Sequence, residues 1–472
     1  MSKLIAIYVL TAAVFVLVVA LLLHAGQPLP VLNHDPALLK KAAAYVPHSA
    51  TIWNAFAEKF KEPLATLLLQ LIVIIFATRT VGRLFSRFGQ PAVIGEIAAG
   101  ILLGPSLFGW LWPQAFAAVF PKESLNILHM FSQVGVCLFM FVIGMELDIG
   151  RLRERAQTVI AVSQFSIIVP YVLGVASALF LYPSFGNPGT SFSSFALLMG
   201  IAMAITAFPV LARILSDRGI AKTELGVTAI TCAAVGDASA WAILAFVVTV
   251  ARTSEFESSI LTIALLIAFV LLMFAAVRPL LARWLVPEDL TLSRDIIAVV
   301  LLLVTFASLI THMIGVHALF GAFLAGTVMP REERFLGELR VRLELLTSVF
   351  LLPLFFAFSG LRTQIGLLQD LESWMICILV VGIATVGKLG GSMIPARLTG
   401  MNWGDAFSLG ALMNTRGLVE LIALNIGYDL GILSPRIFTI MVIMALMTTC
   451  MTCPLLNLAD CLRSKVAIRI NA

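Results

Sequence analysis

One pattern occurs twice in this chain, as Ala92-Val-Ile-Gly-Glu-Ile-Ala-Ala-Gly100 and as Ala318-Leu-Phe-Gly-Ala-Phe-Leu-Ala-Gly326. Both copies read A-x-x-G-x-x-x-A-G, lie in apolar segments and precede a proline. We expect an odd number of membrane crossings between them, which reverses the direction of the chain. The two copies therefore predict inverted repeats of five helices each, about residues 91–250 and 316–458.

The composition is that of a membrane protein. Of 472 residues, 60% are hydrophobic and 12% are charged, and the mean hydropathy is +1.03. Apolar stretches near the ~20 residues that span a bilayer recur along the chain. The expected fold class is therefore all-α integral membrane, with about 13 to 14 transmembrane helices.

The basic residues give an orientation. Most of the 31 Lys and Arg residues fall on one side of the predicted topology, in clusters such as Arg151/Arg153/Arg155 and those of residues 331–342. The positive-inside rule places that side, and both termini, in the cytoplasm, as in a bacterial inner membrane. The net charge of +5 reflects this bias, and no basic domain indicates nucleic-acid binding.

Three regions are expected. Residues 1–62 hold an additional transmembrane helix, about 4–23, and an external loop, because the apolar run is longer than a signal-peptide core. Residues 63–460 form the membrane domain, and 461–472 form a short cytoplasmic tail. The six cysteines fall in predicted spans or at the cytoplasmic end, and they imply no disulfide, metal site or cofactor.

The fourth helix of each repeat is interrupted. Thr206-Ala-Phe-Pro209 and Asn414-Thr-Arg-Gly417 break their apolar segments at equivalent places. Two broken helices in register leave backbone carbonyls and half-helix ends that can face a cation. A simple kink at each break is the alternative.

Asp237 is the residue on which the functional interpretation depends. It lies in the apolar run 225–250, fifteen residues from both Lys222 and Arg252, and therefore ~22 Å from either charge along a helix. A carboxylate at that depth indicates an ion or proton pathway. Desolvation favours its protonated form, whereas a cation or Lys388 favours the charged form, so proton and cation compete.

Other charges in predicted spans have two interpretations each. Lys388 is either part of the transport site or a structural counter-ion. Glu96 either carries a proton or cation, or forms hydrogen bonds that support packing. Arg416 and Glu420, four residues apart, more readily form an ion pair that holds the broken helix than handle the cation directly.

Several motifs together resemble the monovalent cation:proton antiporter-2 family, in particular plant cation/proton exchangers and Kef-type membrane domains. The similarity covers about residues 63–460. Its motifs are Gly95-Glu-Ile-Ala-Ala-Gly-Ile-Leu-Leu-Gly-Pro105, Phe141-Val-Ile-Gly-Met-Glu-Leu-Asp148, Phe208-Pro-Val-Leu-Ala-Arg-Ile-Leu215, Gly236-Asp-Ala-Ser-Ala-Trp241, Gly321-Ala-Phe-Leu-Ala-Gly326 and Met413-Asn-Thr-Arg-Gly-Leu-Val-Glu-Leu421.

The resemblance implies a sodium/proton-antiporter fold with crossed broken helices, a homodimer, and a core domain that moves like an elevator. It implies that Asp237, with Thr206 and Lys388, binds the cation or proton. Glu96 and Asn414 are candidates for the path. No metal is expected other than the transported cation.

Two departures qualify the resemblance. Position 236 is glycine where electrogenic relatives carry a second aspartate, so the site has one carboxylate and exchange is expected to be electroneutral. No nucleotide-binding motif follows the last predicted span, so Kef-type nucleotide control is not expected.

The predicted function is a K⁺ or Na⁺/H⁺ antiporter, a secondary active transporter and not an enzyme. A gated K⁺ channel and a Na⁺-coupled organic anion transporter of the same fold are the alternatives. A membrane enzyme is less consistent with the sequence, which shows neither a metal-spaced His/Glu set nor a nucleophile elbow.

Overall fold

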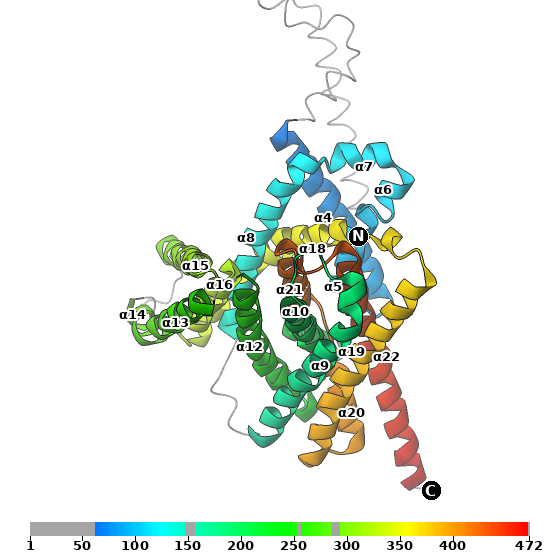
Figure 1. The fold of residues 1–472 in the computed structure, drawn as a ribbon. Coiled ribbons are helices and arrows are strands. Elements are labelled where there is room, and N and C mark those ends of the chain that lie inside the picture. Colours follow the sequence, from blue (N-terminus) through cyan, green and yellow to red (C-terminus); the bar gives the residue numbers. More distant parts are fainter. Residues whose placement is uncertain (1–61, 147–155, 253–255, 285–292, 471–472) are drawn as a thin grey trace, which may run out of the picture. The chain divides into compact units, whose positions relative to one another are not determined.

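The computed structural model describes residues 62–146, 156–252, 256–284 and 293–470 (Figure 1). The chain from Pro63 to Ala472 forms a unit of its own. The predicted helix 4–23 and nearly all of the 25–62 loop lie outside the described residues. The described part is almost entirely helical.

The first half of this unit runs from α4 to α12. Its helices are α4 (Pro63–Arg87), α5 (Ala92–Leu103), the short α6 (Phe108–Leu111) and α7 (Pro113–Val119), α8 (Lys122–Glu146), α9 (Ala156–Phe185), α10 (Phe192–Ala204), α11 (Phe208–Asp217) and α12 (Glu224–Arg252). Ser191 caps the start of α10 by accepting a hydrogen bond from the Ser194 amide.

The second half follows a connecting pair of helices. The pair is α13 (Phe256–Leu272) and α14 (Arg278–Trp284), joined by the π-turn η2 (Met273–Val277). The remaining elements are α15 (Arg294–Ile314), α16 (Ala318–Thr327), α17 (Glu333–Leu346), the π-turn η3 (Thr347–Leu351), α18 (Leu352–Arg362), the 3₁₀ turn η4 (Ile365–Leu367), α19 (Leu371–Leu398), α20 (Trp403–Met413), α21 (Leu418–Asp429) and α22 (Pro435–Ile470).

Membrane-spanning helices dominate the described residues. Eleven are long and apolar enough to cross a bilayer, and the α20/α21 pair, bent by 41°, would make a twelfth. The ten-residue α16 is a shorter apolar helix. This confirms the prediction of an all-helical membrane protein, and the described spans correspond to the segments predicted beyond residue 62.

The two predicted helix breaks are present. The segment 205–207 separates α10 from α11, and 414–417 separates α20 from α21. Pro209 occupies the first turn of α11, where its missing N–H costs nothing. Gly417 lets α21 begin close to α11, because a Cβ atom there would lie 2.9 Å from Val210 Cγ2.

The repeated pattern has the same packing role in both halves. A Cβ atom on Gly100 of α5 would lie 2.6 Å from the carbonyl oxygen of Phe356 in α18, and one on Gly360 would lie 2.2 Å from the Gly100 carbonyl carbon. In the other copy, a Cβ atom on Gly326 of α16 would lie 2.9 Å from Gly144 Cα in α8. Each motif helix therefore crosses a helix of the opposite half at a glycine-to-glycine contact.

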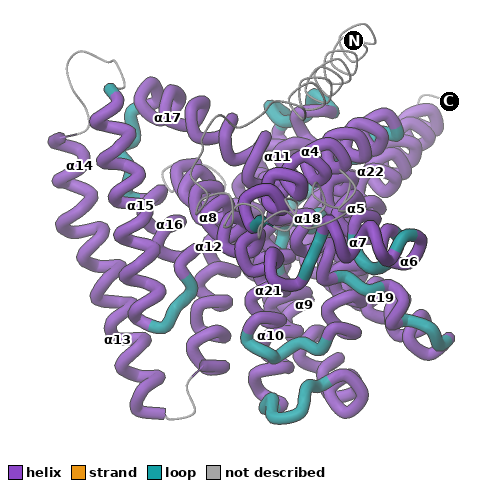
Figure 2. Tube along the Cα trace, turned by 90° about the horizontal axis from the view of Figure 1, so that it is seen from above, coloured by secondary structure: helices purple, strands orange, loops and turns teal. Residues whose placement is uncertain are grey.

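The helices fall into two packed groups. The crossing group, α9–α12 with α19–α22, surrounds the two breaks, whereas the flanking group consists of α4, α5, α8, α15, α16 and α18. Figures 1 and 2 show α13, α14 and α15 together on one flank. Between the groups, Trp241 of α12 packs on Phe320 and Phe323 of α16, at centroid distances of 5.5 and 6.2 Å.

Gly326→Ala should destabilise the protein. The new Cβ would lie 2.2 Å from the Phe141 carbonyl oxygen, so the two helices must move apart. This overpacking should destabilise the fold by about 1–3 kcal/mol, whereas the better helix propensity of alanine should stabilise it by ~0.5–1 kcal/mol. Thermal unfolding in lipid nanodiscs measures the effect. Gly382→Ala in α19 is the control and should unfold no earlier than wild type, because its Cβ would meet no described atom within 4 Å. Equal midpoints for the two variants would contradict the proposed contact.

Candidate ion-binding site

The two breaks lie against each other. The Ala207 amide donates a hydrogen bond to the Thr415 carbonyl at 2.9 Å. The Thr206 hydroxyl donates to the Met413 carbonyl at 3.1 Å. The two breaks, more than 200 residues apart in the sequence, thereby bond to each other inside the protein, where water is excluded.

Asp237 is buried in α12 with 1% of its surface exposed. Neither carboxylate oxygen has a hydrogen-bond partner among the described residues. The backbone amide of Phe208, in the first turn of α11, lies near the Asp237 carboxylate but does not reach hydrogen-bond geometry. The charge of Lys388 also acts on this carboxylate. The carboxylate thus faces the positive end of a half-helix and has both oxygens available for a proton or a cation.

Lys388 does not form the direct ion pair with Asp237 that its position suggested. Its fully buried ammonium donates to the Ser166 carbonyl at 2.8 Å and to the Ala204 carbonyl at the end of α10. Pro170 has no N–H, so the Ser166 carbonyl lacks its helical partner, and Lys388 replaces it. The ammonium therefore neutralises backbone charge while remaining in electrostatic range of Asp237.

Arg416 and Glu420 form the predicted ion pair. Their charged atoms are 3.4 Å apart, and both side chains are fully buried. Arg416 also donates to the carbonyls of Ala202 and Met203 at 2.7 and 2.6 Å. Arg416 and Lys388 together satisfy the last carbonyls of α10. Glu420 lies in the first turn of α21, where the helix dipole favours a negative charge.

Asn414 and its neighbours are held by α22. The Asn414 amide donates to the Thr448 carbonyl at 3.3 Å, and its Oδ1 has no partner in the described part of the chain. The Thr449 hydroxyl accepts from the Arg416 amide at 2.9 Å and donates to the Arg416 carbonyl at 3.0 Å. The sequence reasoning missed Thr449, although the hydroxyl-rich Thr448-Thr449 in an apolar helix was a visible signal.

Glu96 lies elsewhere in the fold. It is buried in α5, its Cγ approaches Gly82 of α4, and Arg79 of α4 is the charge that acts on it. These contacts place it beside α4, in the flanking group. Its predicted role in a proton or cation path stays a prediction.

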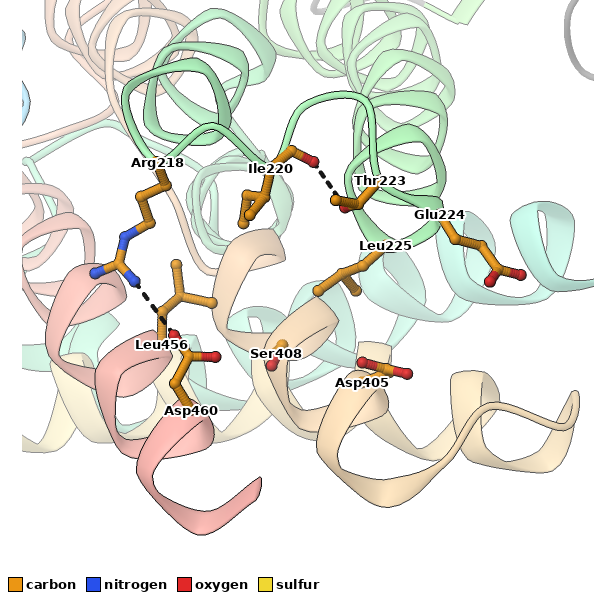
Figure 3. A pocket seen from close by; sticks show the side chains of 9 residues that line it. All are labelled: Arg218, Ile220, Thr223, Glu224, Leu225, Asp405, Ser408, Leu456 and Asp460. Atoms are coloured by element: carbon orange, nitrogen blue, oxygen red, sulfur yellow. Dashed lines mark hydrogen bonds and ion pairs between the residues drawn. The ribbon is translucent and has the colours of Figure 1, made fainter. Parts of the chain in front are cut away.

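Two cavities open beside the crossing group at the end where α11 finishes and α12 begins. One, of about 400 Å³, is lined by the acidic residues Glu224, Asp405 and Asp460 among others (Figure 3). The other, of about 540 Å³, lies beside the loop between α4 and α5. Arg218 lines both and donates to the Cys453 carbonyl at 3.0 Å on α22.

The chain is similar to known antiporters over most of its length. It is 43% identical over 395 residues to the Na(+)/H(+) antiporter NhaS4 of Synechocystis, covering 83% of this chain and 96% of that protein. It is 39% identical to Cation/H(+) antiporter 17 of Arabidopsis thaliana (84% of this chain, 48% of that one) and 31% identical to K(+)/H(+) antiporter 1 of Saccharomyces cerevisiae (86% and 47%). The chain spans about half the length of these plant and yeast relatives.

The fold is also that of a solved antiporter. The sodium proton antiporter MjNhaP1 of Methanocaldococcus jannaschii superposes with a TM-score of 0.61 at 12% identity, covering 84% of this chain and all of that one. This confirms the predicted sodium/proton-antiporter fold. Residues 71–458 match the family model described as "Sodium/hydrogen exchanger, transmembrane". The chain therefore belongs to the sodium/hydrogen exchanger family of cation/proton antiporters.

Proposed function

We propose that this protein exchanges K⁺ or Na⁺ for protons, with Asp237 binding either ion in turn. The observation that supports this most directly is the buried carboxylate of Asp237, whose oxygens have no hydrogen-bond partner among the residues that the structure describes. An empty, unpaired carboxylate is too costly to keep in a low-dielectric interior, so the site must hold a proton or a cation when it moves. That requirement couples the two fluxes.

Polar oxygens close to the breaks are the proposed additional ligands. The hydroxyl of Thr206 and the Oδ1 atom of Asn414 belong to the two helix breaks, and Oδ1 bonds to no other described group. Small monovalent cations favour such neutral oxygens beside one carboxylate. Lys388 and Arg416 then serve chiefly to stabilise the α10 end, because each donates to its carbonyls.

The proposed movement is an elevator. The crossing group would carry Asp237 past the flanking group, with the apolar Trp241 contacts forming part of the sliding surface. We further propose a homodimer in a bacterial inner membrane, with both termini cytoplasmic, as the arginine distribution favours. The boundaries of the two inverted repeats, 91–250 and 316–458, belong to the same proposal.

Asp237→Asn should reduce cation-driven proton movement to the background of empty vesicles, because the amide cannot exchange a proton for a cation. Proteoliposomes containing a pH dye and pulsed with K⁺, Na⁺, Li⁺ or Rb⁺ measure this and rank the cations. Asp295→Asn, an exposed acid in the first turn of α15, is the matched control and should exchange normally. Wild-type rates in Asp237→Asn would refute the assignment of the site.

Exchange should be electroneutral, because one carboxylate takes either one proton or one monovalent cation. A solid-supported-membrane recording should show no sustained current for the wild-type protein. A Cβ atom on Gly236 meets no described atom within 4 Å, so Gly236→Asp can add a second carboxylate without a collision. That variant should produce a current, since one uncompensated charge per cycle couples exchange to voltage at ~2.3 kcal/mol per 100 mV. A sustained wild-type current would contradict the one-for-one stoichiometry.

Arg416→Ala should lower the free energy of unfolding by a good part of the ~3–5 kcal/mol typical of breaking a buried pair. It removes the side chain that pairs with Glu420 and bonds the carbonyls of Ala202 and Met203. Arg334→Ala breaks an exposed pair with Glu338 at the same i,i+4 spacing and should cost about 0–1 kcal/mol. If Arg416→Ala loses transport and unfolds at the wild-type temperature, Arg416 handles ions directly.

A further inference from the structure

A polar cluster connects the two helix groups at the end of the protein where α21 finishes. Arg362, at the end of α18, lies 2.7 Å from Asp429, at the end of α21, and donates to the Asn425 side chain at 3.1 Å. His129 of α8 lies 3.5 Å from Asp429 on its other oxygen. We name His129, Arg362, Asn425 and Asp429 the latch cluster.

Aromatic rings hold the latch cluster in place. The His129 ring stacks on Phe358 with centroids 4.7 Å apart and an interplanar angle of 9°. The Arg362 guanidinium lies 4.2 Å from the centroid of the same ring and 5.1 Å from that of Tyr428. The side chains of His129 and Arg362 are therefore oriented before they reach Asp429, which lowers the entropy lost in forming the contact.

Further hydrogen bonds join the two groups near the latch cluster. Asn425 donates to the Ser359 hydroxyl at 2.8 Å, and the Gln364 amide donates to the Thr439 hydroxyl at 3.1 Å. The broken span α20/α21 finishes at Asp429. Asp405, which lines the 400 Å³ cavity, lies in the first turn of α20, at the opposite end of that span. The groups are thus joined by this cluster at one end. At the other end, where the two cavities lie, Gln90 of the α4–α5 loop donates to the Cys450 carbonyl of α22 at 3.4 Å.

We propose that the latch cluster closes the outer end of the transport path and opens when the crossing group moves. This rests on the proposed antiport mechanism and orientation. The side chains of Arg362, His129 and Asp429 are only 18–31% exposed. Their polar groups are therefore partly desolvated in the closed state and return to water when this end of the protein opens. The equilibrium between the two states then depends on this contact.

His129 contacts two groups through one ring nitrogen. Its Nε2 atom lies 3.0 Å from the Gln133 amide nitrogen and 3.5 Å from an Asp429 oxygen. The groups that face His129 are therefore Gln133 on its own helix, Asp429 of α21 and, beyond Asp429, Arg362 of α18.

Arg362→Gln should weaken the latch and increase the outward-open population. The apparent KM for the cation should then fall about 3- to 10-fold at the outer face, where binding needs the open state, and change little at the inner face. Right-side-out and everted membrane vesicles measure the two faces. Arg436→Gln is the matched control, because Arg436 pairs with Asp370 at the same end but within the crossing group.

Hydrogen–deuterium exchange of the same variants in lipid measures the opening directly. Residues 356–364 and 422–430 should take up deuterium faster in Arg362→Gln and at the wild-type rate in Arg436→Gln. An unchanged outer KM and unchanged uptake in Arg362→Gln, with Asp237→Asn still inactive, would refute the latch and leave the antiport mechanism standing. Equal effects of both arginine variants would also refute it.

Discussion

Everything in this fold depends on satisfying two interrupted helices in a low-dielectric interior. Each break exposes backbone donors, acceptors and half-helix dipoles that lipid cannot hydrate. The protein meets this requirement with a direct backbone bond between the breaks, from Ala207 to Thr415, and with two buried cations on the α10 end. Two buried acids of the crossing, Asp237 and Glu420, are then left with carboxylate oxygens that no described group hydrogen-bonds, and Glu420 has Arg416 at 3.4 Å as a counter-ion.

The charged side chains are placed asymmetrically at the crossing. Arg416 and Lys388 both donate to carbonyls at the α10 end, Glu420 lies in the first turn of α21, and Asp237 faces the start of α11. Glu420 has Arg416 as a fixed counter-ion, whereas Asp237 has no such partner at bonding distance within the described chain. A mobile cation or a proton can take the place of the counter-ion that Asp237 lacks.

Much of this could be predicted from the sequence, because the relevant signals are local. Hydropathy indicated the spans, Pro209 and Gly417 marked the breaks, and the spacing of Arg416 and Glu420 predicted their pair. The hydrogen bond from Lys388 to the Ser166 carbonyl was harder to predict. That carbonyl lacks its helical donor because of Pro170, which lies 218 residues before Lys388 in the chain. The contacts among His129, Arg362 and Asp429 left no local signal, because they arise only when three helices that are distant in the sequence meet.

The glycine contacts between α5 and α18, and between α16 and α8, also bear on synthesis. The last glycine of each motif finds its close partner in the other half, so Gly100 of α5 enters the membrane long before Gly360 has been translated. At typical elongation rates of ~5–20 residues per second, the roughly 260 residues between Gly100 and Gly360 take about 13–50 seconds. During that interval Gly95 can already pack against Gly82 of α4, but the Gly100 face of α5 lacks its native neighbour. That face must either remain loosely packed or be protected by the insertion machinery until α18 arrives.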